Sequence, residues 1–167
     1  VFGLMPAMTM HAEAADTSPQ LYLAGLEMKD GDYLLEGATA TTTTKPGSGY
    51  GYAYYKDGTL LLHNYSYAGQ GFLINDVPHV LFCRGSLTIK LEGISNLTQT
   101  LDWSSASAIT VYGDLTIVGG HDLDIVSTSR GIYTHEDILI ENDGGEIDVK
   151  SGRYGLYSYG YYGGKVI

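Results

Sequence analysis

Aromatic, arginine and histidine side chains recur at two equivalent positions of successive segments of the chain. The two sets are Phe82, Thr110, Tyr133 and Tyr157, and Arg84, Tyr112, His135 and Tyr159. Flat aromatic rings pack against the C–H faces of sugar rings, and tyrosine, arginine and histidine side chains bond to sugar hydroxyl groups. The sequence therefore predicts that these side chains form a polysaccharide-binding surface. The alternative is that the aromatic residues simply favour strands and stack across them, or lie under a loop.

An acidic pair repeats in the same way, because Asp114 and Asp137 occupy the same position of two successive segments. Two carboxylates on neighbouring segments can share a calcium ion, whereas an Asp just before a strand more often bonds to the backbone of a turn. Calcium at this pair is the only cofactor that the sequence suggests. The histidines show no paired spacing of the kind that zinc sites have. Apart from His135, we expect them in loops, His63 and His79 among them.

Catalysis is a less favoured interpretation. Polysaccharide lyases need a basic proton acceptor beside the substrate's carboxylate, and glycosidases need two carboxyl groups at a set distance. Arg130 and Arg153 fall at nearly matching positions, and Asp122 and Asp124 are close in sequence, but no catalytic motif surrounds them. We therefore expect no enzyme activity and assign no catalytic residue.

The elements that would position these side chains form a repeat. Leu81, Ile109, Ile132 and Leu156 occupy equivalent places, with spacings of 28, 23 and 24 residues between neighbours. A unit of this length is typical of one coil of a solenoid, in which coils stack and their inward side chains form one continuous core. Every inference about which side chains share a face depends on this register.

Within a unit, apolar residues alternate in three short runs. In the segment that begins at 108, the alternating residues are Ile109 and Val111, Leu115 and Ile117, and Leu123 and Ile125. Such alternation turns one side of each strand toward a core. The breaks between the runs in this segment and the next carry glycines that suit turns with positive φ, namely Gly113, Gly119, Gly120, Gly144 and Gly145. Three strands per coil predict an all-β parallel β-helix, and the crossover preference of parallel strands makes it right-handed.

Composition agrees with an all-β chain and excludes some partners. The 167 residues include 23 glycines and 15 tyrosines, and 17% are charged. The net charge of −10 argues against nucleic acid and anionic membranes, because both need basic patches. The sequence contains no run of about 20 apolar residues, so it predicts no membrane-spanning segment. The single cysteine, Cys83, leaves no internal disulfide and, because it aligns with inward Val111, is expected to be a buried apolar residue.

The start of the chain resembles a processing segment. The apolar run Val1–Met5 is followed by an A-x-A cleavage pattern at 12–14, so we expect an exported protein whose mature chain begins near Ala15. We also expect the sequence to be truncated at both ends. The predicted regions are the signal-peptide end at 1–14, a linker at 15–20, an irregular N-terminal cap with the first coil at 21–79, and further coils at 80–167.

The N-terminal cap is expected to be built from short strands and turns. We expect a short strand at Leu23–Leu26, an edge strand or loop at Ala38–Pro46, and a hairpin-type turn at Asp57-Gly58. A cap of this kind covers the end of a solenoid, where unpaired strand edges would otherwise pair with other chains.

Three segments resemble a pattern that recurs in large surface proteins of anaerobic bacteria, namely Lys56–Tyr67, Gly85–Gly93 and Gly113–Ile117. Such proteins are often described as carbohydrate-binding-domain-containing and are similar to the β-helical cellulose- and pectin-binding adhesin family. The resemblance implies a parallel β-helix, a secreted or cell-surface location, and a binding or adhesion role with a polysaccharide as partner and further domains in the same longer chain. A structural stalk that spaces other domains from the cell is the alternative function. Exposure of the aromatic side chains distinguishes the two.

Overall fold

The computed structural model describes residues 20–160 and 164–167, and within these ranges the chain forms strands, turns and loops but no helix. Consequently, none of the described residues forms a helix that could cross a membrane. The predicted signal-peptide end at 1–14 and the predicted linker as far as 19 lie outside the described residues.

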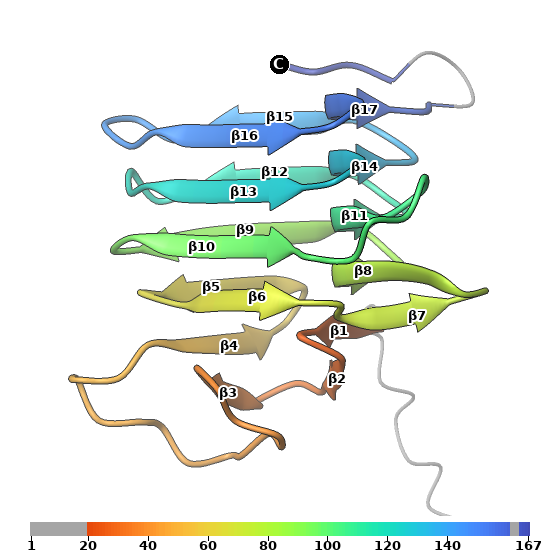
Figure 1. Ribbon diagram of the computed structural model, residues 1–167. Coiled ribbons are helices and arrows are strands. Elements are labelled where there is room, and N and C mark those ends of the chain that lie inside the picture. Colours follow the sequence, from red (N-terminus) through yellow and green to blue (C-terminus); the bar gives the residue numbers. More distant parts are fainter. Residues whose placement is uncertain (1–19, 161–163) are drawn as a thin grey trace, which may run out of the picture.

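The strands form three sheets that run along the molecule (Figure 1). Sheet A contains β1 (Leu21–Leu23), β2 (Leu26–Met28), β7 (Phe72–Ile74), β8 (Val77–Cys83), β11 (Ser107–Val111), β14 (Arg130–Thr134) and β17 (Tyr154–Ser158). Sheet B contains β3 (Tyr33–Leu35), β4 (Tyr52–Lys56), β5 (Thr59–His63), β9 (Leu87–Glu92), β12 (Leu115–Val118) and β15 (Ile138–Glu141). Sheet C contains β6 (Ser66–Gly69), β10 (Ser95–Gln99), β13 (Leu123–Ser127) and β16 (Ile147–Ser151).

Successive coils contribute one parallel strand to each sheet, as the repeat predicted. Leu81 pairs with Ile109, Ile109 with Ile132, and Ile132 with Leu156, so the predicted register is confirmed across all of these coils. In Figure 1 the chain runs to the right along the front in β10, β13 and β16, and to the left along the back in β9, β12 and β15, while it rises. The chain is therefore a right-handed parallel β-helix.

The alternating apolar residues form the core. Ile109, Val111, Leu115 and Ile117 are fully buried, as are Leu123 and Ile125 on the third strand of the same coil. Residues of the next coil lie above them in register, and each buried aliphatic side chain contributes about 1.5–3 kcal/mol relative to an exposed one. Cys83 is also fully buried in this core, as predicted, and burial raises the pKa of its thiol.

The glycines between the strands serve two different purposes. Gly119, Gly120 and Gly144 have positive φ, as the sequence predicted. The same prediction is wrong for Gly113 and Gly145, which do not have positive φ. At these two positions a Cβ atom would instead meet the backbone of the coil beneath, so close contact between coils is what favours glycine there.

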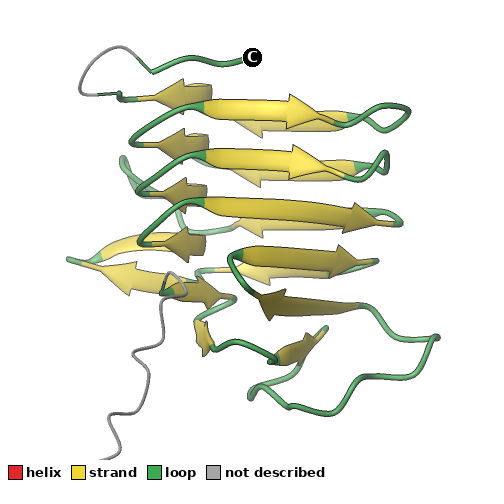
Figure 2. Cartoon of the chain, turned by 180° about the vertical axis from the view of Figure 1, so that it is seen from behind, coloured by secondary structure: helices red, strands yellow, loops and turns green. Residues whose placement is uncertain are grey.

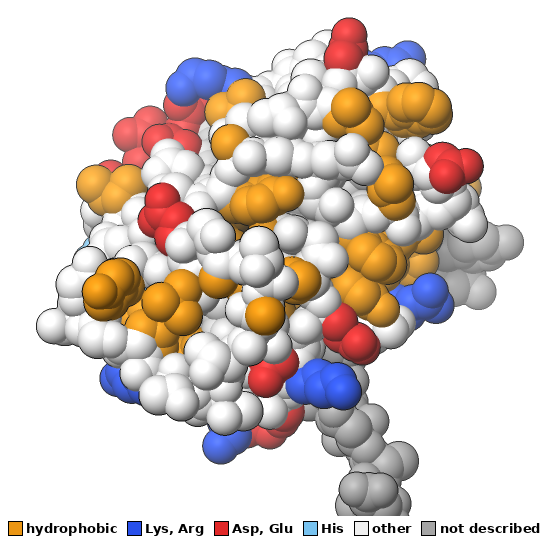
Figure 3. Space-filling model, turned by 60° about the horizontal axis from the view of Figure 1, so that its bottom comes forward, with side chains coloured by type: hydrophobic (Ala, Val, Ile, Leu, Met, Phe, Trp, Pro, Cys, Tyr) orange, Lys and Arg blue, Asp and Glu red, His pale blue; other side chains and the backbone are white. Residues whose placement is uncertain are grey.

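Antiparallel strands cover the N-terminal end of the β-helix. β1 pairs antiparallel with β8 and β2, while β3 and β4 extend sheet B beyond β5. Asp57-Gly58 is the hairpin turn between β4 and β5, as predicted, whereas the strand expected at Leu23–Leu26 is interrupted by a turn with positive φ at Ala24 and Gly25. The segment 36–51 is a long loop at this end (Figure 2), and it contains the predicted Ala38–Pro46 region. On this face the apolar side chains lie in separate groups between charged ones (Figure 3).

Candidate functional site

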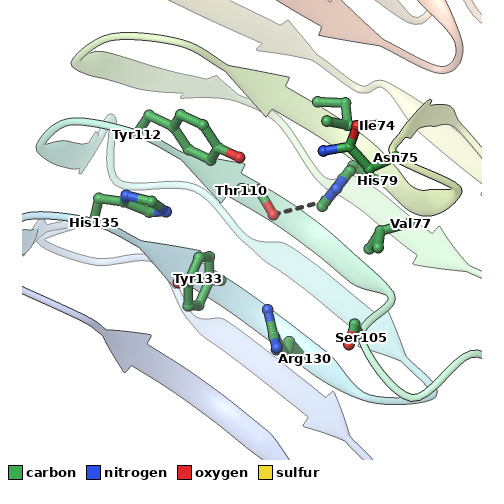
Figure 4. Close-up of a pocket in the computed structure, with 10 residues that line it drawn as sticks. All are labelled: Ile74, Asn75, Val77, His79, Ser105, Thr110, Tyr112, Arg130, Tyr133 and His135. Carbon is green, nitrogen blue, oxygen red and sulfur yellow. Dashed lines mark hydrogen bonds between the residues drawn. The ribbon is translucent and has the colours of Figure 1, made fainter.

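A pocket of about 280 Å³ opens on the outer face of sheet A (Figure 4). Its walls come from the hairpin that joins β7 to β8, from the loop that precedes β11, and from β8, β11 and β14 with the residues that follow them. The lining residues are Ile74, Asn75, Val77, His79, Ser105, Thr110, Tyr112, Arg130, Tyr133 and His135.

The structure brings three of the predicted binding residues together in this pocket, namely Tyr112, Tyr133 and His135. They meet because Thr110 pairs with Tyr133 between β11 and β14, so outward side chains of neighbouring coils stand beside one another. Tyr157 continues this line of side chains on the next coil, and its ring centroid lies 5.6 Å from that of Tyr133. We call Tyr112, Tyr133, His135, Tyr157 and Tyr159 the aromatic row.

The aromatic rings stack mainly on one another instead of presenting flat faces outward. The rings of Tyr112 and His135 are stacked with centroids 4.2 Å apart, and those of Tyr133 and Tyr157 are parallel within 6°. The guanidinium carbon of Arg130 also lies over the Tyr133 ring, 4.7 Å from its centroid. The surface expected from the sequence thus offers ring edges and polar groups as well as ring faces.

Four of the predicted binding residues lie outside the pocket lining, namely Phe82, Arg84, Tyr157 and Tyr159. Phe82 points out of the coil but is fully buried, because Tyr22 of β1 and His79 pack beside it and Tyr112 meets it edge-on at 5.0 Å. Its expected role in binding ligand is therefore wrong. Arg84 is exposed beyond the end of β8 and does not line the pocket.

His79 is a pocket residue that sequence reasoning missed. It lies in β8, is 7% exposed, and its Nδ1 atom is 2.9 Å from the hydroxyl oxygen of Thr110. The expectation of a loop position is wrong for His79 and also for His63, which lies in β5. The register places His79 beside Ser107, which in turn pairs with Arg130. Strict alternation from inward Leu81 would turn His79 toward the core, so the sequence pattern held no signal for its outward position.

Burial keeps the histidines of the pocket neutral near pH 7. Burial, assisted by the charge of Arg130, lowers the pKa of His79 to about 4. Burial also lowers the pKa of His135, against a smaller opposing effect of Glu136. Burial raises the pKa of Tyr133 above its usual value although Arg130 opposes this, so its hydroxyl keeps its proton and can donate.

Arg130 is therefore the charged group of the pocket near pH 7, and no carboxylate is among the lining residues. The sequence had pointed to Arg130 only together with Arg153, as a feature that an enzyme might use. The two arginines differ in the structure, because Arg153 is exposed and its Nη1 donates to the carbonyl of Ser104 at 3.1 Å.

The acidic pair Asp114 and Asp137 forms a ladder along the turns. The carboxylate of Asp114 accepts from the backbone N–H of Asp137 at 3.1 Å, and that of Asp137 accepts from the N–H of Lys165 at 2.8 Å. Both carboxylates border a second hollow of about 260 Å³. Calcium takes six to eight oxygen ligands, and the described residues include no cluster of three or more metal-binding side chains. Both backbone hydrogen bonds fit the turn-bonding alternative, and calcium binding at this pair stays a prediction.

Fold and pocket together define a β-solenoid with a polar and aromatic site on one sheet. No protein-family model, no curated protein and no solved structure matches the chain.

Proposed function

We propose that the protein is a secreted or cell-surface carbohydrate-binding module without catalytic activity, and that its site is the pocket on sheet A. The observation that carries the proposal is the composition of the pocket. Around a space of about 280 Å³, it combines the hydroxyl groups of Tyr112 and Tyr133, the guanidinium of Arg130 and the imidazole of His135. Pockets for drug-sized ligands begin near 300 Å³, so this one suits a single sugar residue.

Exposure of the aromatic row supports binding over a purely structural stalk. Tyr112 is 43% exposed and Tyr159, on the uppermost described coil, is 55% exposed, whereas a stalk would not need uncovered aromatic side chains. The row also spans several coils, because the ring of His135 lies 6.1 Å from that of Tyr159. A sugar chain that enters the pocket therefore has further aromatic and hydroxyl groups to contact on the neighbouring coil.

The pocket favours binding over hydrolysis. A glycosidase needs two carboxyl groups that flank the scissile bond, and the residues that line this pocket include none. We therefore expect a bound oligosaccharide to be recovered with its length unchanged after long incubation, as measured by chromatography.

A glycan array followed by calorimetry with the tightest ligand tests the proposal. Tyr133→Ala removes a hydroxyl and also the ring on which Arg130 rests, so we expect at least about a tenfold loss of affinity. Tyr157→Ala removes the stacking partner of Tyr133, and we expect a smaller loss. Tyr133→Phe separates the two contributions of Tyr133, because it removes the hydroxyl alone.

Tyr50→Ala is the matched control. Tyr50 is 63% exposed in the loop between β3 and β4, which belongs to the N-terminal cap, and we expect no change in affinity. Unchanged affinity of Tyr133→Ala and Tyr157→Ala for every glycan that the parent binds would remove the proposal, as would the absence of any glycan ligand.

A further inference from the structure

Arg130 is partly buried, whereas the lysines and the other arginines of the described chain are exposed. Within the described residues, its guanidinium lies over the ring of Tyr133 and has no hydrogen-bond or ion-pair partner. The chain carries 19 acidic residues against 9 lysines and arginines, so acidic partners are abundant elsewhere. A partly buried guanidinium that keeps its N–H donors free in a pocket is arranged to receive an anion from outside.

The neutral histidines leave room for one anionic group. Because His79 and His135 are uncharged near pH 7, the pocket holds one positive charge and not three. The planar guanidinium matches a carboxylate with two parallel hydrogen bonds. The nearby Asn75 amide and Tyr133 hydroxyl can bond the hydroxyl groups of the same sugar ring.

The hairpin between β7 and β8 closes one end of the aromatic row. Its turn residues Asn75 and Asp76 both have positive φ, which is the conformation of a tight two-residue hairpin, and Ile74 and Asn75 stand at the edge of the pocket (Figure 4). Past this point the next aromatic side chain is Phe82, which is fully buried, and Arg84 lies exposed beyond the end of β8. A sugar chain lying along the row from Tyr157 toward the pocket would therefore end there.

We propose that the pocket binds the terminal residue of a glycan chain that carries a carboxylate, with Arg130 pairing the carboxylate and the β7–β8 hairpin stopping the chain. This inference rests on the carbohydrate-binding function proposed above, and it adds both the charge of the ligand and the position of the recognised sugar.

Three matched probes test the inference by calorimetry. The first is an oligosaccharide that ends in a uronic or sialic acid, the second has that carboxylate reduced to the alcohol, and the third has a neutral sugar added beyond the acid. We expect the parent protein to bind the first probe at least about tenfold more tightly than either of the others, because the second lacks the carboxylate that pairs with Arg130 and the third meets the β7–β8 hairpin.

Arg130→Gln is expected to abolish the preference for the acid, so that this variant binds the acidic probe and the reduced probe with equal affinity. Arg153→Gln is the matched control and should keep the preference, because Arg153 is exposed and does not line the pocket. Thermal unfolding of each variant establishes that it is folded.

The outcomes separate the two proposals. If neutral and acidic ends bind equally in the parent, or if the capped acid binds as tightly as the terminal one, the inference is overturned while carbohydrate binding stands. If none of the probes and no glycan on the array binds, both the carbohydrate-binding proposal and this inference are contradicted.

Discussion

At the scale of single residues, the buried histidine of the pocket has the strongest consequence for stability. His79 is held neutral by burial next to Arg130, and its imidazole contacts the Thr110 hydroxyl. In the unfolded chain its pKa returns to about 6.5. Between that value and the folded pKa of about 4, the unfolded state binds more protons than the folded state, so stability rises with pH.

We therefore expect the free energy of unfolding to fall between pH 7 and pH 5, with His79 contributing about 2 kcal/mol of the loss. His79→Gln keeps a group that can bond to Thr110 but does not titrate. The free energy of unfolding of this variant should therefore fall by about 2 kcal/mol less than that of the parent over the same pH range. Urea unfolding of both proteins at the two pH values measures the difference. Equal losses would show that His79 is not held neutral.

The carboxylate of Asp114 provides a second prediction at this scale, since it accepts from the backbone N–H of Asp137. Asp114→Ala should lower the free energy of unfolding by about 1 kcal/mol, whereas Asp114→Asn keeps an acceptor oxygen and should change it little. Thermal unfolding with and without added calcium completes the experiment. A midpoint that calcium raises in the parent but not in Asp114→Asn would establish the pair as a calcium site instead of a turn ladder.

At the scale of elements, the strands that belong to the repeat were predictable and the cap strands were less so. The alternation around Ile109 and Ile132 reflects burial on one side of each strand, which any sequence must encode to form the core. The break at Ala24-Gly25 was missed because non-glycine residues with positive φ are uncommon, and Leu23 and Leu26 alone resemble a strand. The cap pairs antiparallel and does not repeat, so no second copy of its pattern was available for comparison.

The register of the coils leads to a prediction at this scale. Ile132 is fully buried between Ile109 and Leu156, so Ile132→Ala should lower the free energy of unfolding by about 2–5 kcal/mol. Val126→Ala on the adjacent β13 is the control, because Val126 is 37% exposed and should cost no more than about 0.5 kcal/mol. Chemical denaturation measures both, and similar costs at the two sites would contradict the inward placement of Ile132.

At the scale of the whole molecule, the outer row of the site could be predicted but its enclosure could not. The register placed Tyr112, Tyr133 and His135 on one face, which the structure confirms. The pocket also needs the turn between β7 and β8, which lies outside the repeat. The position of β7 depends on tertiary contacts such as the stacking of the Tyr22 and Phe72 rings, with centroids 3.8 Å apart. The same contacts cover Phe82, which explains why one predicted member of the row is lost.

The stacking of the coils also has a mechanical consequence. Strand pairing in the described part of the chain joins each coil only to the coils above and below it, so a pull along the axis loads one layer of backbone hydrogen bonds at a time. Under such tension the molecule should yield from an end in steps, and each step would release a coil of 23–28 residues, or roughly 80–95 Å of extended chain. A protein of this build would act as a graded extensible tether, dissipating force stepwise while the coils that remain folded keep their shape.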